Sequence, residues 1–90
     1  MEKRAIYKYK IGAIGETTFV FPFHTEVLHF GCINGEFFIW VTAILKTKYE
    51  IQDVEHIYQI VGTGWEFTEN WYHQGTTIEE GYVWHLLLKD

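Results

Sequence analysis

Residues 27–41 have the sequence VLHFGCINGEFFIWV, in which Asn34-Gly35 stands between two apolar runs. Asn-Gly is the pair that best accepts the positive φ angles of a two-residue type I′ turn, so this stretch predicts a β-hairpin. In that register Leu28 lies opposite Val41. Because side chains alternate across a strand, one face is wholly apolar and is the expected core face. It carries Leu28, Phe30, Cys32, Phe37, Ile39 and Val41.

The other face of the hairpin carries His29, Gly31, Phe38 and Trp40. A face this apolar is not expected to remain open to water, so it predicts contact with a second layer, a partner subunit or a ligand. His29, Phe38 and Trp40 are therefore candidate interface residues. We expect the chain to form a homo-oligomer.

Outward from the hairpin, the hydrophobic period is two, with glycines between short runs of aromatic and β-branched residues. These runs predict strands over Ala5–Ile11, Thr17–Phe23, Val54–Val61, Tyr72–Ile78 and Tyr82–Leu88. Pro22 favours an edge position for the second of them. Residues 46–53 predict a loop, and Thr68 could cap one helical turn over residues 68–71. The expected fold is all-β, with about seven mainly antiparallel strands in a small sandwich or partly closed barrel.

Length and composition fit one β-rich domain over residues 1–90. The chain is 48% hydrophobic and 19% aromatic, which is enough apolar surface for a packed core. Its formal net charge of -5 opposes the counterion release that dominates binding to duplex DNA. Duplex DNA is therefore not an expected partner.

The single cysteine, Cys32, cannot form an intrachain disulfide, which favours a reducing compartment and hence the cytoplasm. The first eight residues lack the apolar stretch of an export signal. The longest nearly apolar run, residues 37–45, is about half of the ~20 residues that a membrane-spanning helix needs. We expect no membrane association.

The sequence offers few groups for covalent chemistry. It contains no serine, and the predicted core position of Cys32 favours an inert thiol with a raised pKa. The five histidines lack the spacing of metal-binding motifs, although histidines on different strands could converge. We therefore expect a non-enzymatic protein without cofactor or metal, and a metal-assisted hydrolase is the competing class.

Several segments together resemble a known family: Ile6-Tyr7-Lys8-Tyr9, residues 27–40, Ile60-Val61-Gly62-Thr63-Gly64 and Val83-Trp84-His85-Leu86. The chain is similar to the small uncharacterised proteins, under a hundred residues long, of bacteriophages and prophages. It departs from them at Trp65, where the family often has a histidine followed by proline. The resemblance implies phage origin and action in the host bacterial cytoplasm.

Small phage accessory proteins of this kind are often counter-defence factors that act by binding. In one mode the chain sequesters a nucleotide immune signal, with Trp65 or Trp71 stacking on the base. Gly62, Thr63, Gly64, His85 and a lysine would then meet phosphate, and His73 is a further candidate ligand-binding residue. In a second mode an aromatic and acidic surface caps a host defence protein or a nucleic-acid-binding protein. A virion or replication accessory role is a third possibility.

Overall fold

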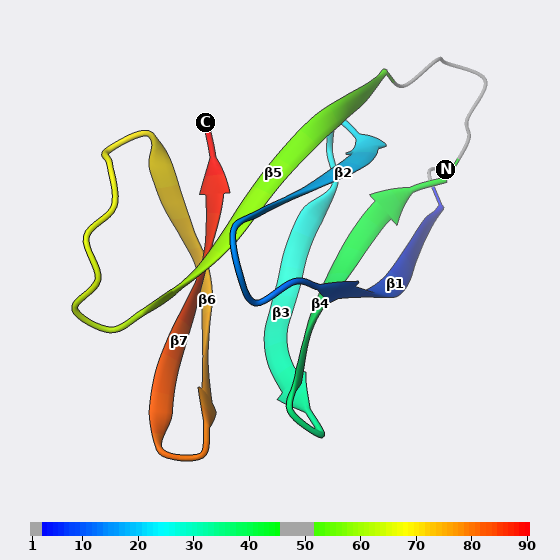
Figure 1. The fold of residues 1–90 in the computed structure, drawn as a ribbon. Coiled ribbons are helices and arrows are strands. Elements are labelled where there is room, and N and C mark those ends of the chain that lie inside the picture. The colour runs from blue at the N-terminus through cyan, green and yellow to red at the C-terminus, as the bar shows by residue number, and fades with distance from the viewer. Residues whose placement is uncertain (1–2, 46–51) are drawn as a thin grey trace.

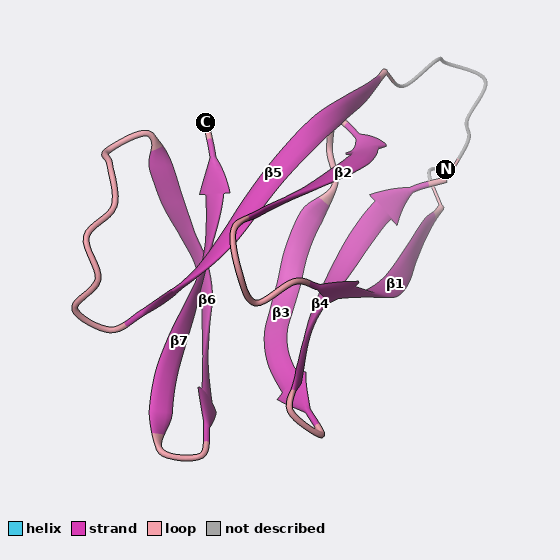
Figure 2. Cartoon of the chain, viewed as in Figure 1, coloured by secondary structure: helices cyan, strands magenta, loops and turns pink. Residues whose placement is uncertain are grey.

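The computed structural model describes residues 3–45 and 52–90, which form seven β-strands and no helix. The strands are β1 (Arg4–Ile11), β2 (Glu16–Pro22), β3 (Glu26–Ile33), β4 (Glu36–Ile44), β5 (Asp53–Gly62), β6 (Trp71–Glu79) and β7 (Tyr82–Lys89). Figure 1 shows their course, and Figure 2 distinguishes the strands from the loops by colour. The predicted all-β class is therefore confirmed. The loop predicted over residues 46–53 lies mostly outside the described residues, and Asp53 already belongs to β5.

The strands form two antiparallel sheets, with the orders β1-β4-β3 and β2-β5-β7-β6. The chain crosses to the four-stranded sheet at residues 12–15 and returns at residues 23–25, so β2 lies in a different layer from β1 and β3. The two sheets pack as a small sandwich and do not close into a barrel. As Pro22 suggested, β2 is an edge strand.

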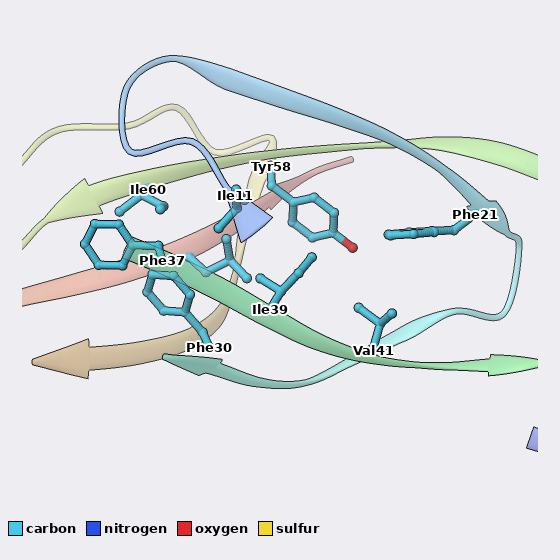
Figure 3. Close-up of a cluster of buried hydrophobic side chains, with 9 residues drawn as sticks. Ile11, Phe21, Phe30, Phe37, Ile39, Val41, Tyr58 and Ile60 are labelled. Atoms are coloured by element: carbon cyan, nitrogen blue, oxygen red, sulfur yellow. The ribbon is translucent and has the colours of Figure 1, made fainter. Parts of the chain in front are cut away.

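The core lies between the two sheets and draws on six of the strands (Figure 3). Phe30 of β3 and Tyr58 of β5 are each 1% exposed, and Ile39 of β4 is fully buried. Burial of one such side chain stabilises the fold by about 1.5–3 kcal/mol. The whole cluster comprises Ile11, Phe21, Phe30, Phe37, Ile39, Val41, Tyr58, Ile60 and Leu86.

The predicted hairpin is present as β3 and β4. Asn34 and Gly35 have φ angles of 51° and 80°, as a type I′ turn requires. Cys32 pairs with Phe37 as expected, and the pairing continues in the same register as far as His29 and Trp40.

The register prediction is wrong at Leu28, because β3 has a bulge between Val27 and His29. Val27, not Leu28, lies opposite Val41. A bulge places one extra residue on its strand and turns the following alternation by one position. Leu28 consequently leaves the core face and is 52% exposed, while Val27 packs against the core.

Two other local predictions differ from the structure. Residues 68–71 form a turn and not a helical turn: the Trp71 N–H donates to the Thr68 carbonyl at 3.2 Å. The Asn70 carbonyl accepts a hydrogen bond from the Asp90 N–H at 2.8 Å, which ties this segment to the end of β7. Phe23, predicted as the end of a strand, lies beyond β2 and is 62% exposed.

One edge of each sheet meets the other at β3 and β6. At this seam Gly75 of β6 lies against Phe30 of β3, and a Cβ atom on Gly75 would be 3.0 Å from the Phe30 Cβ. The pairing of β6 with β7 is irregular between His73 and Gly75, which places the glycine at a bulge. The absent side chain therefore allows the two sheets to approach closely on this side.

Candidate ligand-binding site

The segment after β5 begins with a tight turn over residues 62–65. The Trp65 N–H donates to the Gly62 carbonyl at 3.1 Å, and the Thr63 N–H donates to the Val83 carbonyl at 3.2 Å. The Trp65 indole lies directly on Gly62, where a Cβ atom would be 3.0 Å from the indole Nε1. A glycine is thus required at position 62 for this placement of the ring.

Trp65 stands between two hollows. One, the histidine hollow, has a volume of about 190 Å³ and is formed chiefly by Thr63, Trp65, Phe67, His73, His85 and Leu87. The other, the tryptophan hollow, has a volume of about 460 Å³ and is formed chiefly by Gly62, Trp65, Gly81, Tyr82, Val83 and Trp84. The indole of Trp65 is 57% exposed, so it is accessible to a ligand.

A chain of hydrogen bonds runs beside the histidine hollow across β6 and β7 to the turn after β5. Thr63 Oγ1 lies 2.8 Å from His85 Nε2, and His85 Nδ1 lies 2.9 Å from Thr76 Oγ1. Thr76 Oγ1 in turn lies 2.8 Å from His73 Nε2. Strand register creates this chain, because Thr76 lies directly opposite His85.

The Thr76 hydroxyl has a single proton, so it can donate to only one of the two imidazoles. If it donates to His73, then His85 must donate to it through Nδ1 and accept from Thr63 at Nε2. If it donates to His85, then His73 donates through Nε2 and His85 donates to Thr63. In both cases, neutral His73 and His85 carry their proton on the same ring nitrogen, Nδ1 in the first case and Nε2 in the second.

Six of the seven residues proposed for ligand binding line the histidine hollow. They are Gly62, Thr63, Gly64, Trp65, His73 and His85. The seventh, Trp71, lines neither hollow. It is only 9% exposed and packs with Val61 and Leu87 at the start of β6, with Lys89 Nζ 5.8 Å from the ring centroid.

Sequence reasoning missed two residues of this site. Phe67 lines the histidine hollow and is 51% exposed, and its only sequence signal is an aromatic residue within a polar segment. Thr76 links the two histidines, but its role depends on the exact register of β6 against β7, which local sequence does not specify.

The glycine turn does not offer the row of free amides that an anion-binding cradle needs. The Thr63 and Trp65 N–H groups already donate to backbone carbonyls. Among the described residues, no lysine or arginine lines either hollow. The expected lysine contact to a phosphate is therefore not found there.

Cys32 packs against the core, as expected, and is half-buried. Loss of hydration raises the pKa of its thiol, and a hydrogen bond to Glu79 and the charge of that carboxylate raise it further. The thiol is therefore held in its less reactive protonated form. In the described part of the chain, no group of three or more His, Cys, Asp and Glu side chains is placed to hold a metal ion.

The proposed interface residues gather on the outer face of the three-stranded sheet. The His29 and Trp40 ring centroids lie 5.2 Å apart, and those of Phe38 and Trp40 lie 6.3 Å apart. Lys8 Nζ lies 5.0 Å from the centroid of Phe38. This aromatic row is continuous, and both Phe38 and Trp40 are partly exposed.

Over residues 3–45 and 52–90, no helix has the length and hydropathy needed to cross a membrane. No curated protein and no solved structure matches the chain. One family model does match, over residues 2–90, and its description is a domain of unknown function, DUF7352. The match covers nearly the whole chain, and the protein therefore belongs to the DUF7352 family.

Proposed function

We propose that this chain is a non-enzymatic, phage-encoded counter-defence factor that sequesters a nucleotide signal in the host bacterial cytoplasm. The ligand's base occupies the histidine hollow. The observation that carries this proposal is the convergence of residues 62–65, His73 and His85, three separate parts of the chain, around one hollow beside the exposed Trp65 indole. Aromatic faces stack on every nucleobase, and each such contact is worth about 1–3 kcal/mol.

The size of the histidine hollow favours the base as the bound part of the ligand. Its volume of about 190 Å³ is below the ~300–1,000 Å³ typical of sites that enclose a whole small molecule. The described lining residues include no cation to neutralise a phosphate. The sugar and phosphate therefore point toward solvent, and the affinity comes from stacking and hydrogen bonds.

The hydrogen-bond chain supplies the polar contacts. All the hydrogen bonds in this chain can reverse their direction together. Thr63 and His73, at its two ends, can therefore act as donors or as acceptors toward the ligand. A nucleobase edge presents both donors and acceptors. The hollow thus combines two aromatic walls, Trp65 and Phe67, with polar groups able to match such an edge.

A thermal-shift screen of nucleobases, nucleosides and linear and cyclic nucleotides tests this function. A base-containing ligand at a hundred times its Kd should stabilise the fold by about 2.7 kcal/mol and raise the Tm. Trp65→Leu and His85→Ala should each abolish the shift. His24→Ala is the matched control, because His24 lies in the exposed turn after β2 and touches neither hollow.

Two further measurements distinguish sequestration from the other possible functions: whether the ligand is recovered unchanged, and which part of the ligand the site recognises. Unchanged ligand recovered after heat denaturation supports sequestration, whereas converted ligand would show that the protein is an enzyme. Inorganic phosphate or ribose phosphate that reproduces the shift would show that the base is not what the site recognises.

We also propose that two copies of the chain associate through the outer face of the three-stranded sheet. What supports it is the row of aromatic side chains, His29, Phe38 and Trp40, at the centre of that face. Aromatic residues of this kind are enriched where protein surfaces meet. This contact lies on the opposite sheet from the histidine hollow, so a dimer leaves the site open.

A further inference from the structure

The aromatic walls of the tryptophan hollow come from two parts of the chain, the turn after β5 and strand β7. The Trp65 and Trp84 rings stand perpendicular with centroids 5.7 Å apart, and Tyr82 lies 6.4 Å from Trp84. Trp65 and Tyr82 are 57% and 69% exposed. Aromatic faces carry a negative quadrupole, so a hollow with several such faces attracts cations.

Two carboxylates stand at the same end of the molecule. Glu79 lies directly opposite Tyr82 in the pairing of β6 with β7, and therefore on the same face of the sheet. Glu80 follows it in the turn and is exposed. The Asn34-Gly35 turn of the other hairpin lies beside this one, with a Glu79 oxygen within 3.5 Å of where a Gly35 Cβ would be (Figure 1).

The residues that line the tryptophan hollow carry no formal charge, and the two carboxylates belong to the adjoining turn. No lysine or arginine lines the hollow among the described residues. Lys10, on β1, forms an ion pair with Glu36 at 2.9 Å. Across the whole chain the net charge is -5, which adds a long-range attraction for positively charged partners.

We infer that the tryptophan hollow binds the guanidinium group of an arginine side chain on a protein partner. A guanidinium is planar, stacks on aromatic faces and donates forked hydrogen bonds to carboxylates. Trp65 and Tyr82 supply the faces. Glu79 and Glu80 do not line the hollow but adjoin Tyr82 at the β6–β7 turn, where they can accept from the guanidinium. This site adjoins the histidine hollow, and Gly62, Thr63 and Trp65 line both, but the inference does not depend on binding of a base there.

The position of the hollow favours an arginine side chain of a protein partner over a free small molecule as the ligand. Gly81 and Tyr82, at the β6–β7 turn, are part of the lining of the hollow, and this turn lies beside the Asn34-Gly35 turn, so a partner surface that meets the two turns can insert one side chain. A solvated cation alone would gain little from two exposed rings. The acidic turn residues extend the complementary surface beyond the hollow.

Titration of the full chain with short capped peptides, followed by tryptophan fluorescence and calorimetry, tests this inference. One peptide carries arginine and the other carries citrulline, which has the same shape without the charge. The arginine peptide should bind at least tenfold more tightly than the citrulline peptide, and added salt should weaken it. Equal affinity for both peptides, or no binding of the arginine peptide at millimolar concentration, would overturn the inference.

Variants locate the site. Tyr82→Leu keeps an apolar side chain but removes the ring, and should weaken arginine binding at least fivefold while leaving any nucleoside binding unchanged. Glu79→Gln should weaken it several-fold. Tyr72→Leu is the matched control, because Tyr72 is a similarly exposed tyrosine that lines neither hollow.

The remaining outcomes also decide the question. Unchanged arginine affinity in Tyr82→Leu would place the contact elsewhere and reject the hollow. Free arginine binding as tightly as the peptide would reject a protein source and identify a small-molecule site. Loss of nucleoside binding in Tyr82→Leu would instead show that the two hollows act as one site.

Discussion

Gly75 of β6 lies against Phe30 of β3, and the absence of a side chain at position 75 lets the two sheets approach closely at their seam. A methyl group at position 75 would lie 3.0 Å from the Phe30 Cβ, which is closer than carbon atoms pack. We expect Gly75→Ala to destabilise the fold by about 1–3 kcal/mol, because the strands must separate to admit it.

Urea denaturation monitored by tryptophan fluorescence measures this effect. Gly12→Ala is the control, because the nearest atom to its new methyl group would be Thr17 Oγ1 at an acceptable 3.4 Å. Equal losses of stability in both variants would mean that the general cost of replacing glycine, and not the seam, is responsible.

Asn34 and Glu80 occupy equivalent positions in their two hairpin turns, with φ angles of 51° and 48°. Asparagine tolerates this left-handed conformation, whereas most other side chains are strained there by roughly 1–2 kcal/mol. Glu80→Asn should therefore stabilise the protein, by roughly half of that strain. The reciprocal change, Asn34→Glu, should destabilise it by a similar amount, and thermal melts of both variants check the pair.

Burial raises the pKa of Tyr58 to about 12 from the 10 of an exposed phenol. The folded state therefore keeps this proton at pH values where the unfolded state has lost it. Its contribution to the free energy of unfolding is complete below pH 10 and declines as the pH rises from 10 to 12. The decline is on the order of 2 kcal/mol.

The measurement is the free energy of unfolding of the wild type and of Tyr58→Phe as a function of pH. The difference between them isolates Tyr58 from the other tyrosines. It should be flat below pH 10 and should shift in favour of the phenylalanine variant above it. A constant difference up to pH 12 would contradict the assignment.

His73 and His85 should show the same neutral tautomer, because the one proton of Thr76 couples them. Long-range ¹H–¹⁵N correlation spectra distinguish the two tautomers directly. Thr76→Val removes the link and should allow the two rings to differ. Opposite tautomers in the wild type would show that the chain does not form in solution.

Self-association through the outer face of the three-stranded sheet should be lost in Trp40→Glu. The new carboxylate would lie opposite Lys8 in the same sheet, so the monomer itself should remain folded. Light scattering should then report the monomer mass for the variant and a multiple of it for the wild type. Val20→Lys, a new charge on the outer face of the other sheet opposite Glu55, should leave the mass unchanged.

Local sequence predicted most of the fold. Alternation with period two, Asn34-Gly35 and Pro22 are short-range signals, and they identified the strands, the central hairpin and one sheet edge. The Leu28 bulge was missed because an extra residue in a strand has no reliable pattern of its own. The turn at residues 68–71 depends on the distant Asp90 N–H, and so tertiary contact overrode the helical cap signal of Thr68.

The sequence predicted which residues belong to the candidate site, but it could not predict that they lie together. Gly62, Trp65 and His85 stood out by residue type, yet their convergence requires β5, β6 and β7 to pair in one register. Trp71 looked equivalent to Trp65 in the sequence. The difference is that β6 begins at Trp71 and buries its ring, whereas Trp65 remains in the turn.

The arrangement of sheet edges has a consequence for how the protein avoids fibril formation. Unpaired strand edges are templates on which other chains can add strands. Here β3 and β6 face each other at the seam, so each shields the other. The two outer edges are guarded by different means: Arg4, Lys8 and Lys10 line β1, and Pro22 removes a donor from β2. A molecule so rich in aromatic strands can thus resist cross-β stacking at high expression levels.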